Sequence, residues 1–530
     1  MPNIPEQLVE QFYNNYSQAQ DSQAQDSQAH GQTSHAAELN RDVINQLTRL
    51  ALSTEQDVAE LATRAIFASL VERLADSFEP HAARLYNRVF AQIIQLCRSD
   101  SRAAALNREL TGFGLLTEQH LIARAEGLRS RSRLLATAFE YSLKRVIVLS
   151  RVTLGADVAI TSVILERMKL LFPSAEIVVV GGKKTSELFG SDRRLQFKHI
   201  DYRRGGTLID RLLAWIDLLA SVRELTLGIG DGEFLVIDPD SRLTQLGLLP
   251  LTRTRDRGQG TGDRVQGSGF RVSSSELNSG ELPNYLFFPS REYGSTTTKS
   301  LAQLASDWLD EIFGVSETTL PRVSLKREDI EVARQLAAQL RGDRSRRLVA
   351  INFGVGENPL KRVGAEFEAS LINHLARDGV AIILDKGASV EETALVDQVV
   401  AEATSIGRDR RVRSIEVTEA TLIDHLDATH LDADILVWNG RIGMLAALIS
   451  ESDLYIGYDS AGQHIAAALG IPCIDVFAGS SSPRMLDRWK PTGRAETRVV
   501  PVDTLARTSD TGEIVAITLR HADDLLKEPR

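Results

Sequence analysis

Apolar residues follow two different periods along this chain of 530 residues. Between residues 37 and 138 they recur every three to four positions, as at Ile66, Leu70 and Leu74, which predicts amphipathic helices. From Lys144 onward, short and fully apolar runs alternate with stretches of helical period. That alternation is typical of parallel strands buried on both faces. The pattern therefore predicts a helical domain followed by an α/β part.

The α/β part divides into two blocks. The first begins with the apolar run at residues 146–149 and continues to the run at 234–237. The second begins at 348–351 and ends in the segment 452–480, and the two are joined around residues 315–345. Two doubly wound units of this kind would face each other across a cleft at the carboxyl edges of their sheets.

Two polar segments interrupt this organisation. Residues 14–36 contain an imperfect repeat that is too polar to bury, so residues 1–36 are expected to be disordered. Residues 251–283 are rich in Gly, Ser and Arg, which predicts a long mobile loop, either a lid over a substrate or an insertion without function. The expected domains are residues 1–36 (disordered), 37–140 (helical), 141–325 (Rossmann-like, acceptor side) and 326–530 (Rossmann-like, donor side).

Composition excludes several classes of protein. With 43% apolar and 25% charged residues, the chain is an ordinary globular protein, and a net charge of −10 argues against nucleic acid as a partner. Cys97 and Cys473 have no disulfide or metal-ligand spacing. No apolar run approaches the roughly 20 residues of a membrane span, and the first residues lack a secretion signal. A cytoplasmic protein is expected.

The segment from Ser452 to Ser480 carries the strongest chemical signal. It predicts a strand, a polar turn, a short Ala-rich helix and a second strand. The N–H groups at the start of such a helix form an anion site, usually for phosphate. An ordinary capped turn without a ligand is the alternative. The residues expected to hold the anion are Asp459, Ser460, Ala461, Gly462, Gln463 and His464.

This segment resembles the donor-binding motif of glycosyltransferase family 9, the lipopolysaccharide heptosyltransferases, whose pattern is D-S/T-G-x-x-H-x-A-A-A-L-G-x-P. Ala461 stands where the family usually has glycine, and Gly462 follows it. The resemblance covers roughly residues 144–510 and leaves out the helical third. It implies a GT-B fold and the inverting transfer of a sugar from a nucleotide-diphosphate donor, which is ADP-heptose in the best-known members.

The resemblance also implies a general base. Asp157 lies in the segment VIVLSRVTLGADVAIT, which resembles the family's G-D-V/x-L-x-T element with Ala156 between Gly155 and Asp157. A helix N-terminus would favour its ionised form, whereas enclosure in a cleft would raise its pKa. The alternative is a helix cap with no catalytic role.

Donor contacts are implied at a second loop. Lys361 lies in a segment resembling the family element H-P-G/A-x-x-x-x-K-x-W, in which the lysine reaches the donor phosphate. Asn352 replaces the usual histidine and Val363 the usual aromatic residue. The backbone at Gly354 and Val355 is expected to approach the same phosphate.

Three further residues are candidates on weaker signals. Glu391 resembles the glutamate that contacts the donor's ribose or sugar, although an acidic first turn of a helix explains it equally well. Arg242 and Arg291 are candidates to face an acidic acceptor. The glycines at 228–232 precede a strand, not a helix, which predicts a turn and argues against a dinucleotide fingerprint.

The sequence thus predicts a metal-independent glycosyltransferase of GT-B fold that needs no cofactor. Its expected partners are a nucleotide sugar and a glycan, lipid-linked or protein acceptor. Peripheral association with the inner membrane face and self-association through the N-terminal helices stay open. The alternatives are a sugar-nucleotide-binding scaffold without catalysis and a nucleotide-sugar epimerase on the same architecture.

Overall fold

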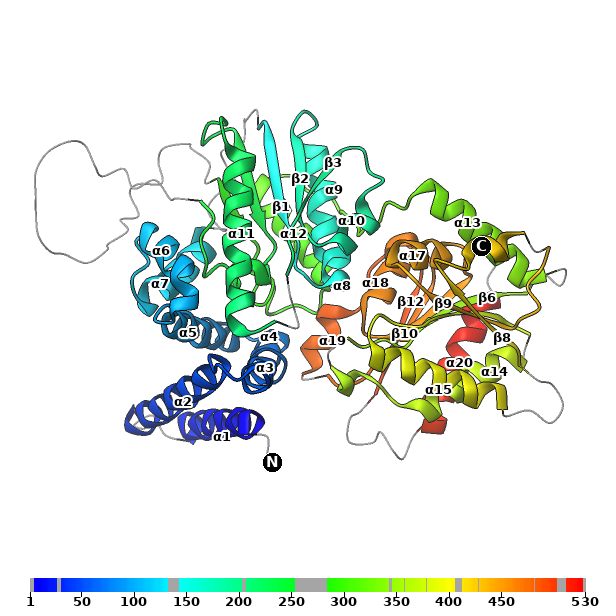
Figure 1. Ribbon diagram of the computed structural model, residues 1–530, viewed down its shortest axis with the longest axis horizontal. Helices are drawn as coiled ribbons and strands as arrows, with labels where there is room; N and C mark the ends of the chain where they lie inside the picture. Colours follow the sequence, from blue (N-terminus) through cyan, green and yellow to red (C-terminus); the bar gives the residue numbers. More distant parts are fainter. Residues whose placement is uncertain are drawn as a thin grey trace, which may run out of the picture.

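The helical region comes first in the chain (Figure 1). The computed structural model describes residues 4–25, 30–131, 143–202, 206–252, 284–342, 346–356, 358–377, 379–405, 412–427, 429–480, 482–502 and 511–527. The helical elements are α1 (Ile4–Gln25), α2 (His30–Ala51), α3 (Gln56–Arg64), η1 (Ala65–Val71), α4 (Glu72–Asp76), α5 (Pro80–Cys97), η2 (Ser101–Ala103), α6 (Ala104–Gly112) and α7 (Glu118–Arg131).

The N-terminal segment differs from the expected disorder, because α1 and α2 cover most of residues 1–36. Leu8, Val9 and Phe12 lie on one face of α1 and are buried in the core of the helical region. The part of α1 beyond Phe12 is polar and contains four Gln residues, a residue type with good helix propensity, beside Asn, Ser and Asp residues that favour a helix less. The three buried side chains near the start of α1 therefore anchor a segment whose polarity suggests a linker.

The first sheet has the strand order β3-β2-β1-β4-β5, and all its pairs are parallel. Its strands are β1 (Arg145–Leu149), β2 (Glu176–Gly181), β3 (Leu195–His199), β4 (Phe234–Asp238) and β5 (Tyr285–Phe287). Its helices are α8 (Leu154–Ala156), η3 (Asp157–Thr161), α9 (Ser162–Leu171), α10 (Lys183–Phe189), α11 (Leu208–Thr226), η4 (Arg242–Thr244) and α12 (Leu301–Phe313). We call this part the first lobe. Its strand order reverses between β1 and β4.

The second sheet has the order β12-β11-β10-β6-β7-β9-β8, again with parallel pairs. Its strands are β6 (Leu348–Asn352), β7 (Ala381–Asp385), β8 (Ser414–Thr418), β9 (Ile435–Asn439), β10 (Leu454–Tyr458), β11 (Cys473–Phe477) and β12 (Thr497–Pro501). Its helices are α13 (Arg327–Arg341), η7 (Pro359–Lys361), α14 (Ala365–Arg377), α15 (Val390–Ser405), α16 (Leu422–Leu426), α17 (Ile442–Ser450), α18 (Ala461–Leu469), α19 (Pro483–Trp489) and α20 (Thr511–Lys527). In this second lobe the order reverses between β10 and β6.

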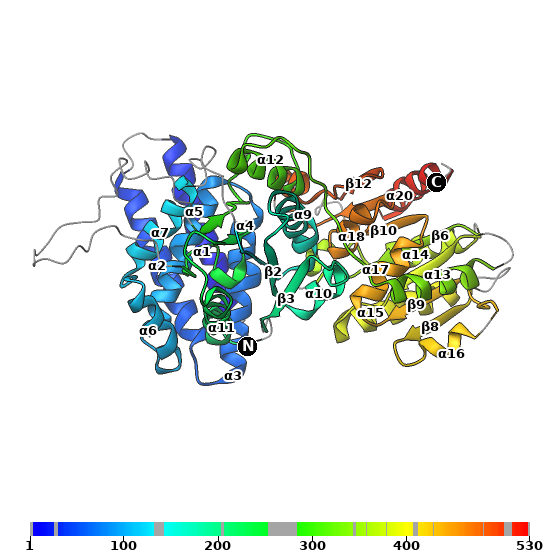
Figure 2. The ribbon, with the colours of Figure 1, turned by 90° about the horizontal axis from the view of Figure 1, so that it is seen from above.

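The helical region and the first lobe share one hydrophobic core. Trp215 of α11 is fully buried, lies beside Phe113 of the helical region with ring centroids 6.4 Å apart, and donates its indole N–H to the Pro250 carbonyl at 2.9 Å. The Leu208 N–H, at the start of α11, donates to Thr63 Oγ1 at 3.0 Å. Figure 2 shows the helical region on one side of the first lobe and the second lobe on the other.

Three further expectations from the sequence can be compared with the structure. The glycines at 228–232 form the turn between α11 and β4, as predicted. Most of the predicted mobile loop, residues 253–283, lies outside the described residues. None of the helices that the structure describes is long and apolar enough to span a membrane.

The shared core gives a stability prediction. Replacing Trp215 by Ala leaves a cavity between α11 and the helical region and should cost about 3–5 kcal/mol of unfolding free energy. Calorimetric unfolding should show the loss in the transition that contains both parts. Leu227, 84% exposed just beyond the same helix, is the matched control, and Leu227→Ala should change stability by less than about 0.5 kcal/mol. Equal effects of the two substitutions would contradict a shared core.

Candidate active site between the lobes

The loops at the two points of strand-order reversal meet each other. Ligands in open α/β sheets bind at such points, beyond the carboxyl ends of the strands. Gly155, in the short helix α8 that follows β1, packs directly on the first turn of α18: a Cβ atom added to Gly155 would lie 3.1 Å from His464 Cδ2 and 3.3 Å from Ala461 Cα. The structure therefore brings the predicted base loop and the predicted anion loop together. We call this region the interlobe site.

Asp157 anchors the loop after β1. Its side chain is buried, and each carboxylate oxygen accepts two hydrogen bonds. Oδ1 accepts from the Arg151 N–H at 2.7 Å and from Thr161 Oγ1 at 2.9 Å, and Oδ2 accepts from Ser150 Oγ at 2.6 Å and Thr185 Oγ1 at 3.0 Å. Burial raises the pKa of Asp157, and the four hydrogen bonds oppose that rise. The carboxylate thus fixes the loop that faces α18.

Lys361 and Asp459 form an ion pair at the point where the strand order of the second sheet reverses. Lys361 Nζ lies 2.5 Å from Asp459 Oδ2, and the lysine side chain is 18% exposed. Gln463 Nε2 donates to Asp459 Oδ1 at 3.0 Å, and Gln463 Oε1 accepts from the Ser460 N–H at 2.6 Å. Burial lowers the pKa of Lys361, but the carboxylates of Asp459 and Asp76 outweigh it and raise the pKa overall. Lys361 is therefore a fixed cation at the start of α18.

The first turn of α18 requires glycine at position 462. A Cβ atom there would lie 2.0 Å from Tyr455 Oη, on the buried face of β10. His464, one turn in, is 4% exposed, and its ring lies edge-on to Trp489 with centroids 6.0 Å apart. Burial lowers the pKa of His464 to about 4, so the ring is neutral at pH 7 and carries one N–H.

The loop after β6 is held by side-chain hydrogen bonds. Asn352 Nδ2 donates to Asp385 Oδ2 at 2.5 Å, and Asn352 Oδ1 accepts from the Gly354 N–H at 2.8 Å. Burial raises the pKa of Asp385 to about 7. Val355 is partly buried against the core of the second lobe. Asparagine at the position of the family's histidine thus shapes this loop.

The glutamate that reaches this loop is Glu392. Its Oε1 accepts from the Gly356 N–H at 3.2 Å, and its Oε2 accepts from the Ala388 N–H at 2.9 Å. Glu391 is exposed, and its pKa is lowered by hydrogen bonds to its own backbone N–H and to Ser389. The sequence shows two adjacent glutamates at the start of a predicted helix. It does not show which of the two side chains faces the loop after β6.

The two arginines predicted to face an acceptor lie under the helical region. Arg242 Nη2 donates to Glu72 Oε1 of α4 at 3.0 Å. Arg291 lies 3.6 Å from Asp240 Oδ1, and its guanidinium stacks 4.9 Å from the ring centre of Tyr86 in α5. Both arginines are thus at the carboxyl edge of the first sheet, but helical residues cover them.

A feature that the sequence analysis missed is the α4–α5 corner, residues 72–80. It reaches α19 in the second lobe: Arg484 Nη1 donates to the Phe78 carbonyl at 3.2 Å and lies 3.3 Å from Glu79 Oε1. Phe78 also lies edge-on to Trp489, with centroids 6.2 Å apart. Figure 1 shows α4 and α19 next to each other between the lobes. The helical region therefore borders the interlobe site.

Asp475 is a second missed residue. It lies on β11 beside Gly457 of β10, is fully buried, and has no hydrogen-bond partner for either oxygen among the described residues. Burial raises its pKa well above the usual value, and the charge of Asp459 adds to that rise. Asp475 is therefore a buried carboxyl group directly below the start of α18 whose ionisation is disfavoured by its surroundings.

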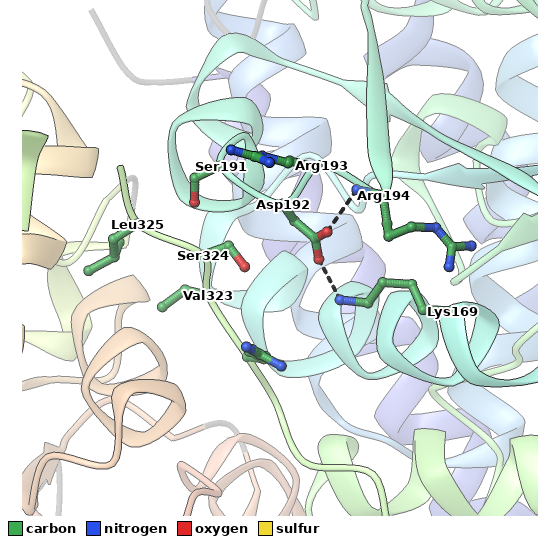
Figure 3. A pocket seen from close by; sticks show the side chains of 9 residues that line it. Lys169, Ser191, Asp192, Arg193, Arg194, Val323, Ser324 and Leu325 are labelled. Atoms are coloured by element: carbon green, nitrogen blue, oxygen red, sulfur yellow. Dashed lines mark hydrogen bonds and ion pairs between the residues drawn. The ribbon is translucent and has the colours of Figure 1, made fainter. Parts of the chain in front are cut away.

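One pocket lies apart from the interlobe site, between Lys169 of α9, residues 191–194 and residues 322–325 (Figure 3). Two of its cationic side chains have carboxylate partners: Lys169 Nζ lies 2.5 Å from Asp192 Oδ2, and Arg322 Nη1 lies 3.6 Å from Glu166 Oε2. None of the predicted site residues lines it. Within the described residues, no group of three or more His, Cys, Asp or Glu is placed to hold a metal ion.

Comparison with protein families gives one match. Residues 420–504 match the model of glycosyltransferase family 9 (heptosyltransferase). These residues include β10, α18 and β11, so the resemblance read from the donor motif is confirmed over this part of the chain. A search of curated protein sequences gives no significant match.

Comparison with solved structures confirms the GT-B fold. The glycosyl transferase family 9 protein from Veillonella parvula DSM 2008 is 17% identical, with a TM-score of 0.50 over 74% of this chain and 100% of that one. E. coli ADP-heptose lps heptosyltransferase II is 16% identical, with a TM-score of 0.45 over 72% and 98% of the two chains. E. coli heptosyltransferase WaaC with ADP is 12% identical, with a TM-score of 0.43 over 71% and 99%.

Close packing at the start of α18 gives a second prediction. Gly462→Ala forces a methyl group against Tyr455 and should cost about 1–3 kcal/mol, seen as a lower melting temperature. The control is Gly512→Ala near the start of α20, where an added Cβ meets nothing within 4 Å and stability should be unchanged or slightly higher. An unchanged melting temperature in Gly462→Ala would mean that Tyr455 does not limit this turn.

Proposed function

We propose that this chain is an inverting glycosyltransferase that moves a sugar from a nucleotide-diphosphate donor to a hydroxyl group in glycan or glycoconjugate synthesis. One observation carries the proposal. A fixed cation, Lys361, and the amide end of α18 meet where the second sheet reverses its strand order, facing the loop that holds Asp157. The family match over residues 420–504 supports sugar transfer as the reaction class.

In this proposal the second lobe holds the diphosphate. As the bond from the sugar to the diphosphate breaks, negative charge grows on the phosphate oxygens. Lys361, the amides of Ala461 to Gln463 and the single N–H of His464 would meet that charge with donors already in place. The ammonium of Lys361 would exchange Asp459 for phosphate. We propose that these donors suffice without a divalent ion.

The donor's glycosyl and nucleoside parts have proposed contacts as well. ADP-heptose is the proposed donor, because the heptosyltransferase family gives the match. Glu391 stays the sequence-based candidate for the ribose or sugar contact, and Glu392, which holds the Gly356 loop, is its neighbour on the same helix turn. Arg242 and Arg291 stay candidates for the acceptor side.

Asp157 stays the sequence-based candidate for the general base. To take a proton from an acceptor, it would have to release at least one of its four hydrogen bonds and become accessible from the interlobe site. Asp157→Asn keeps the shape of the side chain, and the hydroxyls of Ser150 and Thr185 can accept hydrogen bonds from an amide. This variant therefore separates chemistry from folding.

The lysine gives the first functional prediction. Lys361→Ala removes a charge-assisted contact worth about 1.5–3 kcal/mol, so ADP should bind roughly 10- to 150-fold more weakly in titration calorimetry. Lys326→Ala, which removes an exposed lysine just before α13, is the control and should leave the affinity unchanged. Equal ADP affinity in wild type and Lys361→Ala would remove Lys361 from the donor site.

A donor screen tests the function itself. A nucleotide sugar that binds the folded chain raises its melting temperature, and ADP-heptose should do so more than sugars on uridine or guanosine diphosphate. Release of ADP that depends on an added acceptor would establish transfer, and the rate should not fall in EDTA. Donor binding without any turnover would favour the scaffold alternative, and conversion of the sugar without release of the diphosphate would favour an epimerase.

A further inference from the structure

Three aromatic rings form a row from the helical region to the start of α18. Phe78, in the α4–α5 corner, lies edge-on to Trp489 of α19 with ring centroids 6.2 Å apart, and Trp489 lies edge-on to His464 with centroids 6.0 Å apart. Both distances are within the range in which aromatic rings attract each other edge to face. The row therefore connects a residue outside the two lobes with a residue of the proposed donor site.

His464 is oriented by packing alone. Its side chain is 4% exposed, and neither ring nitrogen has a hydrogen-bond partner among the residues that the structure describes. Its neighbours are Gly155 of the first lobe, where an added Cβ would lie 3.1 Å from His464 Cδ2, and the ring of Trp489. The outer torsion of a histidine side chain has only broad preferences of its own, so these neighbours decide where the ring N–H points.

Phe78 is held in place by more than its contact with Trp489. Its side chain is 3% exposed, and its carbonyl accepts a hydrogen bond from Arg484 Nη1 at 3.2 Å. The same arginine lies 3.3 Å from Glu79 Oε1. The φ of Phe78 is +53°, a conformation that is unfavourable for a bulky residue and persists only where the surroundings enforce it. The ring of Phe78 is therefore a fixed support for Trp489.

The first lobe holds α19 from another direction. Arg488, which precedes Trp489, is 2% exposed and donates to the carbonyls of Gly294 and Lys299 at 2.6 Å each. Trp489 thus follows a residue bound to the first lobe, and its own ring contacts the helical region and α18. The position of this ring depends on all three parts of the molecule.

Resting on the proposed function, we propose that Phe78 and Trp489 are positioning residues for the donor. Phe78 supports the ring of Trp489, and Trp489 holds His464 with its N–H towards the diphosphate at the start of α18. A donor group fixed before the ligand arrives loses less freedom on binding and meets the phosphate charge without rearrangement. The helical region thereby contributes to donor binding through His464. A merely structural role of the row would stabilise the junction and leave the phosphate contact unchanged.

The test measures binding of ADP and of adenosine to the full chain by titration calorimetry. His464→Ala should weaken ADP binding roughly 10-fold, because it removes a hydrogen bond to a charged group. Phe78→Leu removes the ring but keeps an apolar side chain, and should weaken ADP binding roughly 3- to 10-fold. Adenosine lacks the diphosphate and should bind both variants as tightly as wild type. Trp489→Leu should behave like Phe78→Leu, and Trp489→Phe, which keeps a ring, should recover part of the affinity for ADP.

The double variant Phe78→Leu/His464→Ala shows whether Phe78 acts through His464. It should bind ADP no more weakly than His464→Ala alone, because residues that act through one contact do not have additive effects. The matched control is Phe172→Leu in the first lobe, where a ring 9% exposed lies 5.8 Å from that of Phe313. This control loses a similar aromatic pair and should bind ADP like wild type.

Three results would overturn the proposal: losses of ADP affinity that multiply in the double variant, an equal loss of affinity for adenosine, or unchanged ADP affinity in Phe78→Leu or His464→Ala. If Phe78→Leu does not fold, Trp489→Leu and its combination with His464→Ala decide in the same way. Failure of wild type to bind either ADP or any nucleotide sugar would instead overturn the proposed function.

Discussion

The ion pair between Lys361 and Asp459 holds together the part of the molecule on which the site depends. It joins the loop after β6 to the start of α18 at 2.5 Å, across the two central strands between which the sheet order reverses. A partly buried lysine without a partner would be costly, and breaking such a pair on one side typically costs several kcal/mol. Asp459 thus stabilises a cation where the fold places its ligand-binding edge. The Asp459 carboxylate also accepts a hydrogen bond from the Gln463 side-chain amide. The side-chain oxygen of Gln463 in turn accepts a hydrogen bond from the backbone N–H of Ser460, the residue that caps α18.

The helical region belongs to the catalytic part of the molecule by its packing. It shares a hydrophobic core with the first lobe, covers Arg242 and Arg291, and contacts α19 of the second lobe through the α4–α5 corner. A separately folded domain would have a hydrophobic core of its own. Because the core is continuous, the position of the corner relative to the lobes is set by the packing of large buried side chains such as Trp215, and only then refined by ion pairs.

The sequence predicted the central strands and the donor loop well, for a physical reason. β1, β6 and β10 are short apolar runs buried on both faces and ended by polar or glycine-bearing turns, so burial alone identifies them. The start of α18 was recognisable because a helix N-terminus after a strand leaves little freedom in residue choice. By contrast, α1 was predicted to be disordered, since three apolar anchors in a polar repeat are too few to show where the segment would pack.

The residues that the sequence did not reveal are those whose roles depend on long-range placement. Glu392 and not Glu391 reaches the Gly356 loop because a step of one residue turns a side chain by about 100° around a helix. Glu79 meets Arg484 of α19 only because the helical region, the first lobe and the second lobe are packed together, and no local pattern around Glu79 distinguishes it from the solvated acids of other helices.

Charge balance connects these observations. The interlobe site contains the cations Lys361, Arg242 and Arg484, and each has a carboxylate partner close by, in Asp459, Glu72 and Glu79. Burial raises the pKa of the Asp475 carboxyl well above its usual value. A diphosphate bound at Lys361 would compete with Asp459 for the same ammonium group. The pairing that keeps the cation in place in this structure is therefore also the pairing that a donor would have to break.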